Sequence, residues 1–152
     1  MSLAPFSIRV LRPDDVSLLE RMSETFGKAF RDEGTYTASR PSVDYLRRLL
    51  GGDSFIALAA LKGDEVVGGI AAYELRKFEQ ERSEIYIYDL AVAEGHRREG
   101  IATALIRDLK KIAVSRGAYV VFVQADYEDA PAIALYTELG TREEVLHFDI
   151  AT

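Results

Sequence analysis

The sequence contains no cysteine and only two histidines, His96 and His147. Without cysteine there can be no disulfide scaffold, thiolate zinc site, iron–sulfur cluster or cysteine nucleophile. The two histidines lie far apart in the chain, so they do not form a histidine-rich metal motif, and we expect no metal. The sequence therefore favours a protein that works without metal or thiol chemistry.

Long apolar runs are also missing. No window approaches the roughly 18–20 apolar residues of a membrane span. The first six residues lack the basic region and apolar core of a signal peptide. We therefore expect a cytoplasmic protein that does not associate with membranes.

Positive charge is in deficit, with 19 Lys and Arg against 25 Asp and Glu and a net charge of −6. Nucleic-acid-binding proteins usually carry a basic face, so this balance argues against a nucleic-acid partner. An acidic protein instead suits a polycationic partner, or no charged partner at all.

The 152 residues show no repeat, linker or low-complexity segment, which predicts one domain over 1–152. Apolar periods of two and of three to four residues alternate along the chain. They predict strand 7–11, helix 13–30, helix 41–52, strands 55–61, 66–75 and 84–92, helix 101–116, strand 119–123, helix 131–139 and strand 145–150. A polar stretch fills 31–40, and Gly68 and Gly69 are expected to loosen their strand. The order β-α-α-β-β-β-α-β-α-β indicates a mixed α/β domain with one central sheet.

A basic loop with glycine precedes the helix predicted at 101–116. Helix N-termini offer unpaired N–H groups and a partial positive charge, and Gly100 and Ala102 let an anion approach the backbone. Arg97 and Arg98 add charged donors. The alternative interpretation is an ordinary solvated loop. Neither a Walker motif nor a Rossmann fingerprint is present.

Two motifs carry a resemblance to a known family. They are Arg97-x-x-Gly100-x-Ala102, directly after Asp89-Leu90-Ala91-Val92, and Asp129-x-x-Ala132-x-x-Leu135-Tyr136-x-x-x-Gly140. Both, with the order of elements over essentially the whole chain, resemble the GCN5-related N-acetyltransferase superfamily. Thr141 departs from the pattern, because many members have an aromatic residue after the glycine. The resemblance implies that superfamily's fold and acetyl-CoA as cosubstrate.

Longer strings resemble one branch of the superfamily more specifically. They are Phe55–Ala60, Lys77–Gln80, Arg82–Val92, Val123–Tyr127 and Glu143–Ile150. These strings look like the type I aminoglycoside 3-N-acetyltransferases, the gentamicin-modifying enzymes of resistance elements. The similarity runs from about Phe26 to Ile150.

The resemblance also implies where coenzyme A is held. The strand ending at Val92 and the strand 119–123 are expected to splay apart around the pantetheine arm, which bonds the backbone of Leu90, Ala91 and Val92. The pyrophosphate is expected on the loop and helix start, formed by Arg97, Arg98, Glu99, Gly100, Ile101, Ala102 and Thr103. In physical agreement, 97–116 holds six basic and two acidic residues, a net charge of +4 in an acidic chain.

Two residues are the candidates for proton transfer. Tyr136 matches the family's tyrosine, and a phenol with a pKa near 10 can protonate a departing thiolate. Its alternative role is a core tyrosine on the face of Ala132 and Leu139. Asp89 interrupts an apolar strand, where a carboxylate needs a partner or a cavity, and is the candidate base for the attacking amine. Its alternative role is a structural hydrogen bond. Without cysteine, direct attack by the amine is expected.

Other carboxylates are candidates for the base or for substrate contacts. They are Glu84, Asp126, Glu128, Asp129 and Asp149. An acidic segment beside the acceptor site would attract ammonium groups, although Asp129 alone could simply cap the next helix. Tyr86, Tyr88 and Tyr127 could stack on sugar rings, with at least one of them expected in the core.

The function implied by the resemblance is acetylation of the 3-amino group of 2-deoxystreptamine in gentamicin-like aminoglycosides, which confers resistance. Alternatives are an acetyltransferase for a polyamine, peptide or protein amine, and a non-catalytic coenzyme A-binding module. Tyr136 and Asp89 argue against a pure binder, which needs neither residue. Family members often dimerise, so a homodimer is expected.

Overall fold

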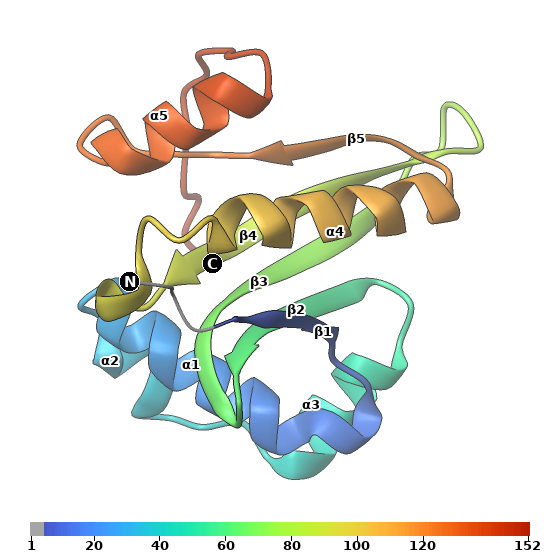
Figure 1. The fold of residues 1–152 in the computed structure, drawn as a ribbon. Coiled ribbons are helices and arrows are strands. Elements are labelled where there is room, and N and C mark those ends of the chain that lie inside the picture. Colours follow the sequence, from blue (N-terminus) through green and yellow to red (C-terminus); the bar gives the residue numbers. More distant parts are fainter. Residues whose placement is uncertain (1–4) are drawn as a thin grey trace.

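The computed structural model describes residues 5–152 and is built on a sheet of five strands (Figure 1). The strands are β1 (Ser7–Val10), β2 (Phe55–Lys62), β3 (Glu65–Arg76), β4 (Ser83–Val92) and β5 (Ala118–Val123). They lie in the order β1-β2-β3-β4-β5. All neighbours are antiparallel except β4 and β5, which are parallel. The mixed α/β sheet predicted from the sequence is confirmed.

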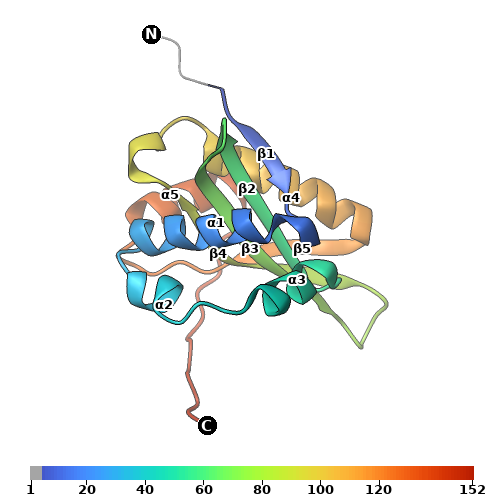
Figure 2. The same ribbon diagram turned by 90° about the horizontal axis from the view of Figure 1, so that it is seen from below.

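Helices cover both faces of this sheet. They are α1 (Val16–Ala29), α2 (Glu33–Thr37), α3 (Val43–Gly51), α4 (Ile101–Arg116) and α5 (Ala130–Leu139), with short 3-10 turns at Pro13–Asp15 and Glu94–His96. The first three helices lie together on one side of the sheet, whereas α4 and α5 share the other (Figures 1 and 2). The bounds of α4 agree with the predicted helix 101–116.

Each face has its own hydrophobic core. Leu105 and Leu109 of α4 are fully buried against the sheet on one side, with Ile70 of β3. On the other side, Met22 and Phe26 of α1 are buried against it. The amphipathic pattern of each helix is thus explained by its packing on one face of the sheet.

Gly68 and Gly69 lie beside an irregularity of β3, as the sequence predicted: Ala60 pairs with Gly68 and Leu61 with Val66, so Val67 is an extra residue. Both are buried in a strand that pairs on both sides. A Cβ added at Gly69 would lie 2.7 Å from Cγ of Met22 and 2.8 Å from the carbonyl oxygen of Leu58. Glycine is therefore needed here for the close approach of α1 to the sheet.

One expectation needs correction. The segment 145–150 is not a strand: it is extended and exposed, and it pairs with no strand of residues 5–152. The polar stretch 31–40, for which no element was predicted, contains α2, whose start is capped by Asp32 accepting from the N–H of Thr35 (3.3 Å). In the part of the chain that is described, no helix has the length and apolar character needed to cross a membrane.

Candidate active site

The strands β4 and β5 separate partway along their length. Their pairing ends at Ile87 and Val123, whereas β4 continues to Val92 and stays paired with β3. From Tyr88 to Val92, the β5 side of β4 therefore has no partner strand within residues 5–152. This free edge contains Leu90, Ala91 and Val92, the residues predicted to bond pantetheine.

A bulge at Tyr88 decides which way Asp89 faces. Ile87 pairs with Ala72 and Asp89 pairs with Ala71, so Tyr88 is an extra residue in β4. Before the bulge, Ile85 and Ile87 face the α4 core; after it, Leu90 and Val92 do so. A bulge that inserts one residue changes the phase of the alternation, and it turns Asp89 toward α1 and α2 instead.

Asp89 lies in a cavity of about 170 Å³ beneath α1 and α2. Its Oδ1 accepts a hydrogen bond of 2.9 Å from the hydroxyl of Tyr36, which belongs to α2. Tyr73 and Arg40 also line this cavity. The carboxylate is half-buried, and it has both a partner and a cavity, as the sequence argument required.

Burial raises the pKa of Asp89 above its ordinary value of 3.8, and the hydrogen bond from Tyr36 partly offsets this increase. Burial and the same bond to Asp89 raise the pKa of Tyr36, which keeps its hydroxyl protonated and donating. The sequence pattern did not single out Tyr36. Its only signal was an aromatic residue within a polar stretch.

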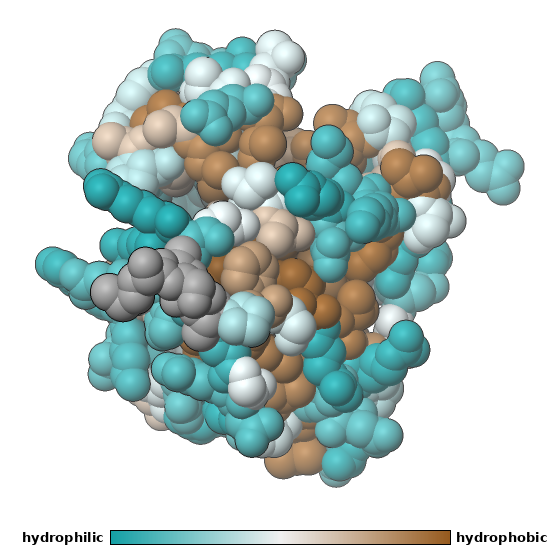
Figure 3. All heavy atoms as spheres, viewed as in Figure 1, coloured by the Kyte–Doolittle hydropathy of each residue, from teal (hydrophilic) through white to brown (hydrophobic). Residues whose placement is uncertain are grey.

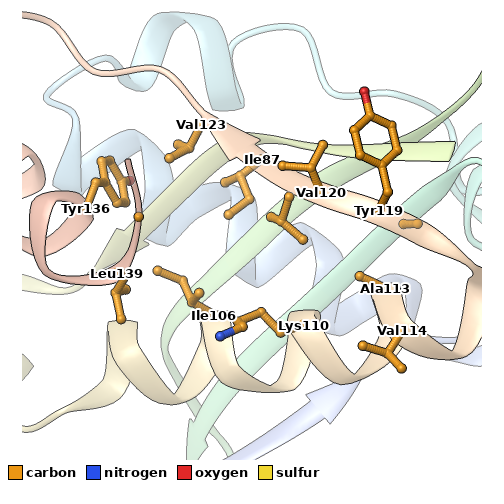
Figure 4. A pocket seen from close by; sticks show the side chains of 13 residues that line it. Ile87, Ile106, Lys110, Ala113, Val114, Tyr119, Val120, Val123, Tyr136 and Leu139 are labelled. Atoms are coloured by element: carbon orange, nitrogen blue, oxygen red, sulfur yellow. The ribbon is translucent and has the colours of Figure 1, made fainter. Parts of the chain in front are cut away.

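Tyr136 lies on the other face of the sheet, in a groove of about 260 Å³ between β5, α4 and α5 (Figure 4). Ile87 and Val123, the last pair of β4 and β5, line the same groove. Tyr136 is therefore beside the point where the two strands separate. Burial, with a smaller effect of the negative charge on Asp129, raises the pKa of Tyr136 to about 12. Its hydroxyl thus keeps its proton at neutral pH.

The predicted phosphate loop leads into α4, whose first backbone N–H groups have no acceptor within the helix. The first helical bond of α4 runs from the N–H of Ala104 to the carbonyl of Gly100 (3.0 Å). The preceding N–H groups, those of Ile101, Ala102 and Thr103, therefore have no acceptor inside the helix. Gly100 has φ +80°, and a Cβ built there would meet no atom within 4 Å. Arg98, with φ +64°, is also left-handed.

The side chains of this loop divide into two groups. Arg97 and Arg98 are exposed, and Nε of Arg97 donates to the carbonyl of Val92 at 3.3 Å. Glu99 is turned inward, where its carboxylate is 2.7 Å from Nζ of Lys62. Both side chains of this ion pair are largely buried. The one acid in the loop is therefore neutralised, which leaves the entrance of α4 favourable for an anion.

Within residues 5–152, the remaining acidic candidates make no contact with the partner of Asp89, which is the hydroxyl of Tyr36. Glu84 is at the opposite end of β4, where it accepts from the hydroxyl of Tyr119. Asp126 and Glu128 are exposed in the loop after β5, and Asp129 caps α5 by accepting from the N–H of Ala132 (3.2 Å). Asp149 is exposed in the C-terminal tail and pairs with His147 at 2.8 Å.

The tyrosines on β4 form an aromatic surface on the Asp89 side. Tyr86 stacks on Phe122 with ring centroids 4.7 Å apart, and Tyr88 packs edge-on against Tyr73 at 6.1 Å. Tyr88 and Tyr127 are exposed, and Tyr86 is half-buried. The expectation that at least one of the three candidate tyrosines is in the core was wrong, because none of the three is fully buried.

No group of three or more His, Asp or Glu side chains suited to a metal ion occurs in residues 5–152. The candidate site combines a helix start with unpaired N–H groups that suit an anion, a free strand edge, and two proton-transfer candidates. These are the parts needed to hold an acyl thioester beside an amine.

Comparison with known proteins identifies the class. The acetyltransferase (GNAT) family matches residues 18–141, and the chain belongs to this family. The family uses acetyl-CoA, which fits the open N–H groups and inward-facing Glu99 at the start of α4.

Three individual proteins illustrate what this chain is similar to. The crystal structure of an aminoglycoside acetyltransferase from an uncultured soil metagenomic sample is 64% identical, with a TM-score of 0.96, over 97% of this chain and 99% of that chain. Another aminoglycoside acetyltransferase from soil, in complex with sisomicin, is 30% identical, with a TM-score of 0.89, over 97% and 96%. N-acetyltransferase 8B of Rattus norvegicus is 29% identical over 89 residues, 59% of this chain and 40% of the rat protein.

Proposed function

We propose that this protein is an aminoglycoside acetyltransferase that transfers the acetyl group of acetyl-CoA to the 3-amino group of the 2-deoxystreptamine ring of gentamicin-like antibiotics. The observation that carries the proposal is Asp89, a half-buried carboxylate in a cavity next to the free edge of β4. The identities to two aminoglycoside acetyltransferases support this substrate class. The position of attack rests on the resemblance of strings such as Arg82–Val92.

Binding of acetyl-CoA is assigned to two parts of the site. The N–H groups at the start of α4 and the side chains of Arg97 and Arg98 bind the pyrophosphate. The backbone of Leu90, Ala91 and Val92 hydrogen-bonds the amide groups of the pantetheine arm. Acetyl-CoA supplies an activated acyl group as a thioester.

The two proton transfers are assigned to residues on opposite faces of the sheet. Asp89 accepts a proton from the substrate ammonium, so that the nitrogen can attack with its lone pair. Tyr36 holds the carboxylate in position through its hydrogen bond. Tyr136 donates its phenolic proton to the departing sulfur, which its raised pKa permits over the whole physiological range.

Acetylation would replace an ammonium group by a neutral amide. The drug would thereby lose one charge and part of its hydrogen-bonding capacity for ribosomal RNA, which is the proposed basis of resistance. On the enzyme, the exposed Asp126 and Glu128 would attract the other ammonium groups of a polycationic substrate.

The decisive experiment is a thiol-release assay with acetyl-CoA and an amine panel of gentamicin, sisomicin, kanamycin, spermidine and a lysine-containing peptide, followed by NMR of the product. We expect turnover with gentamicin and sisomicin, and an acetyl group on N3. Acetylation at another amino group would overturn the 3-N assignment alone. Turnover only with spermidine or the peptide would overturn the substrate class.

A matched test in bacteria uses expression in a susceptible strain. The wild-type chain should raise the inhibitory concentration of gentamicin and sisomicin far more than that of kanamycin or amikacin. The control is Asp89→Asn, expressed to the same soluble level, which should not protect. Equal protection by both chains would contradict the role of Asp89.

A further inference from the structure

The loop that leads into α4, residues 97–100, has few backbone contacts of its own. Just before it, the N–H of His96 donates to the carbonyl of Ala93 (2.9 Å). Within residues 5–152, the N–H groups of the loop itself donate to no backbone carbonyl. Arg98 also has φ +64°, a left-handed conformation that a residue with a Cβ adopts only at a cost. Side-chain contacts must therefore hold the loop in the shape that opens the start of α4.

The side chain of Glu99 makes the contact that the backbone of the loop lacks. Its Oε1 lies 2.7 Å from Nζ of Lys62, a residue 37 positions earlier in the chain. The side chains of Lys62 and Glu99 are only 14% and 8% exposed. The second oxygen, Oε2, lies 3.7 Å from Nδ1 of His96, in the turn before the loop. Glu99 thus ties the middle of the loop to the interior of the protein.

Lys62 has a fixed position in the sheet. It is the last residue of β2, and it pairs with Glu65 of β3 across a turn of two residues. Gly63, in this turn, has φ +59°, which suits a tight hairpin. β2 itself pairs with β1 as well as with β3. The lysine is thus carried by a rigid element, and the loop is the part of the ion pair that can move.

Loss of Lys62 would leave the Glu99 carboxylate buried without its lysine. An unpaired buried charge is strongly unfavourable, so the side chain would turn out to water. The surface around this loop, at the left of Figure 1, is hydrophilic, and Arg97 and Arg98 are exposed on it (Figure 3). The carboxylate would then bring a negative charge to the place proposed for the coenzyme phosphates and would repel them. The ion pair therefore protects an anion site from the one acid in its own loop.

We propose that Lys62 is a positioning residue for acetyl-CoA: through its ion pair with Glu99, it keeps that carboxylate out of the phosphate site and holds the loop against the sheet. This inference rests on the proposed binding of the coenzyme phosphates at the start of α4. Lys62 acts through Glu99 and touches neither the coenzyme nor the amine. Its effect is therefore on the affinity for the coenzyme, and the chemical step does not depend on it.

Calorimetry with coenzyme A on the full chain is the first test. Lys62→Met nearly keeps the length of the side chain but removes its charge, and we expect the Kd to rise at least about tenfold. Lys62→Arg keeps the charge and should bind as the wild-type chain does. The matched control is Lys77→Met, because Lys77 also lies near two carboxylates, those of Glu79 (3.6 Å) and Glu84 (3.7 Å), but follows the far end of β3. An equal Kd in Lys62→Met and in the wild-type chain would overturn the proposal.

Steady-state kinetics separate a positioning role from a catalytic one. In Lys62→Met, the KM for acetyl-CoA should rise together with the Kd for coenzyme A. The kcat at saturating acetyl-CoA and the KM for the aminoglycoside should stay within about twofold of the wild-type values. A fall in kcat at saturating coenzyme, with an unchanged KM for acetyl-CoA, would contradict the proposal.

A double-mutant cycle tests the path through Glu99. In Lys62→Met, the further change Glu99→Met removes the unpaired charge and leaves two apolar side chains of similar size in the buried site, an exchange that proteins tolerate. We expect the double variant to regain most of the lost affinity for coenzyme A. In the wild-type background, Glu99→Met should not tighten binding, because there it only breaks the pair. Tighter binding by the same factor in both backgrounds would show that Glu99 acts as a simple surface charge and that Lys62 has no positioning role.

The results also separate this inference from the proposed function. A wild-type chain that binds coenzyme A and acetylates aminoglycosides, with Lys62→Met unchanged in both, refutes the positioning role alone. A wild-type chain without affinity for coenzyme A refutes the coenzyme site and, with it, this inference.

Discussion

The hydroxyl of Tyr36 donates a hydrogen bond of 2.9 Å to Oδ1 of Asp89, joining α2 to β4 across 53 positions of sequence. This bond lowers the pKa of a carboxyl group that burial raises. The base proposed for the reaction is therefore adjusted by a residue that does not have to touch the substrate.

Tyr36→Phe should make Asp89 a carboxylate that ionises at higher pH. A hydrogen bond to a charged group contributes about 1.5–3 kcal/mol, and one pKa unit equals about 1.4 kcal/mol. We expect the acid limb of the kcat/KM profile for the aminoglycoside to move up by about one to two pH units. Tyr73→Phe removes a hydroxyl from the same cavity without breaking this bond, and it should leave the limb in place. An unmoved limb in Tyr36→Phe would contradict the coupling.

Asp89→Asn keeps the shape of the side chain but removes its basicity. We expect kcat/KM for the aminoglycoside to fall by about 10²–10⁴, with partial recovery as the pH rises and the free amine becomes abundant. The affinity for acetyl-CoA, measured by calorimetry, should not change. If the pH gives no recovery and only KM increases, Asp89 anchors an ammonium group and the base is another carboxylate, with Asp126 and Glu128 the next to test.

Tyr136→Phe removes one oxygen from the groove without changing its packing. Since the thiolate then loses its proton donor, kcat should fall by about 10²–10⁴ while coenzyme affinity stays the same. Tyr119→Phe is the matched control, because that tyrosine lines the same groove and its hydroxyl bonds Glu84. Equal kcat values in the two variants would rule out the acid role of Tyr136.

Gly100→Glu should abolish acetyl-CoA binding. The new carboxylate would project into the open space at the start of α4, where the phosphates are proposed to bind. Part of any loss could come from the left-handed backbone, so Gly117→Glu is the control: this glycine, at φ +76°, is equally open at the other end of α4. Calorimetry should show binding only in the Gly117 variant. Binding by both would place the phosphates elsewhere.

Gly69→Ala tests the close approach of α1 to β3. The added methyl would collide with Met22 and with the backbone of Leu58, and overpacking of this kind costs about 1–3 kcal/mol. We expect thermal unfolding at a clearly lower temperature than in the wild-type chain. Gly34→Ala, in α2 with open space around it, should unfold at or above the wild-type temperature. If the two variants have the same Tm, the packing argument fails.

Local sequence signals predicted α4 well. Its apolar spacing, Gly100 before it and Gly117 after it mark the same bounds that the structure has. The bulge in β4 also has a signal, because the apolar alternation of Ile85 and Ile87 resumes out of phase at Leu90. These features depend on short stretches of chain, which a pattern can capture.

Other features depend on contacts that a sequence pattern does not contain. The strand expected at 145–150 has the right alternation, but a strand exists only when a neighbour pairs with it, and no neighbour lies within residues 5–152. The partnership of Tyr36 with Asp89 depends on how α2 packs over β4. Glu84 was a candidate substrate contact from the sequence, and only the structure shows that it accepts from the hydroxyl of Tyr119 near the start of β4.

The bulge at Tyr88 has a consequence for the fate of protons during turnover. Two protons leave the nitrogen when an ammonium group becomes an amide, but sulfur takes up only one. The bulge directs Asp89 to the face of α1 and α2, while Tyr136 occupies the face of α4 and α5. The proposed base and the proposed acid would therefore exchange protons with solvent on opposite sides of the sheet. In the proposed reaction, both nitrogen protons would leave by way of Asp89, and solvent would return one proton to Tyr136. The net release would be one proton per amide, and the enzyme would regain its starting charge without a relay through the hydrophobic core.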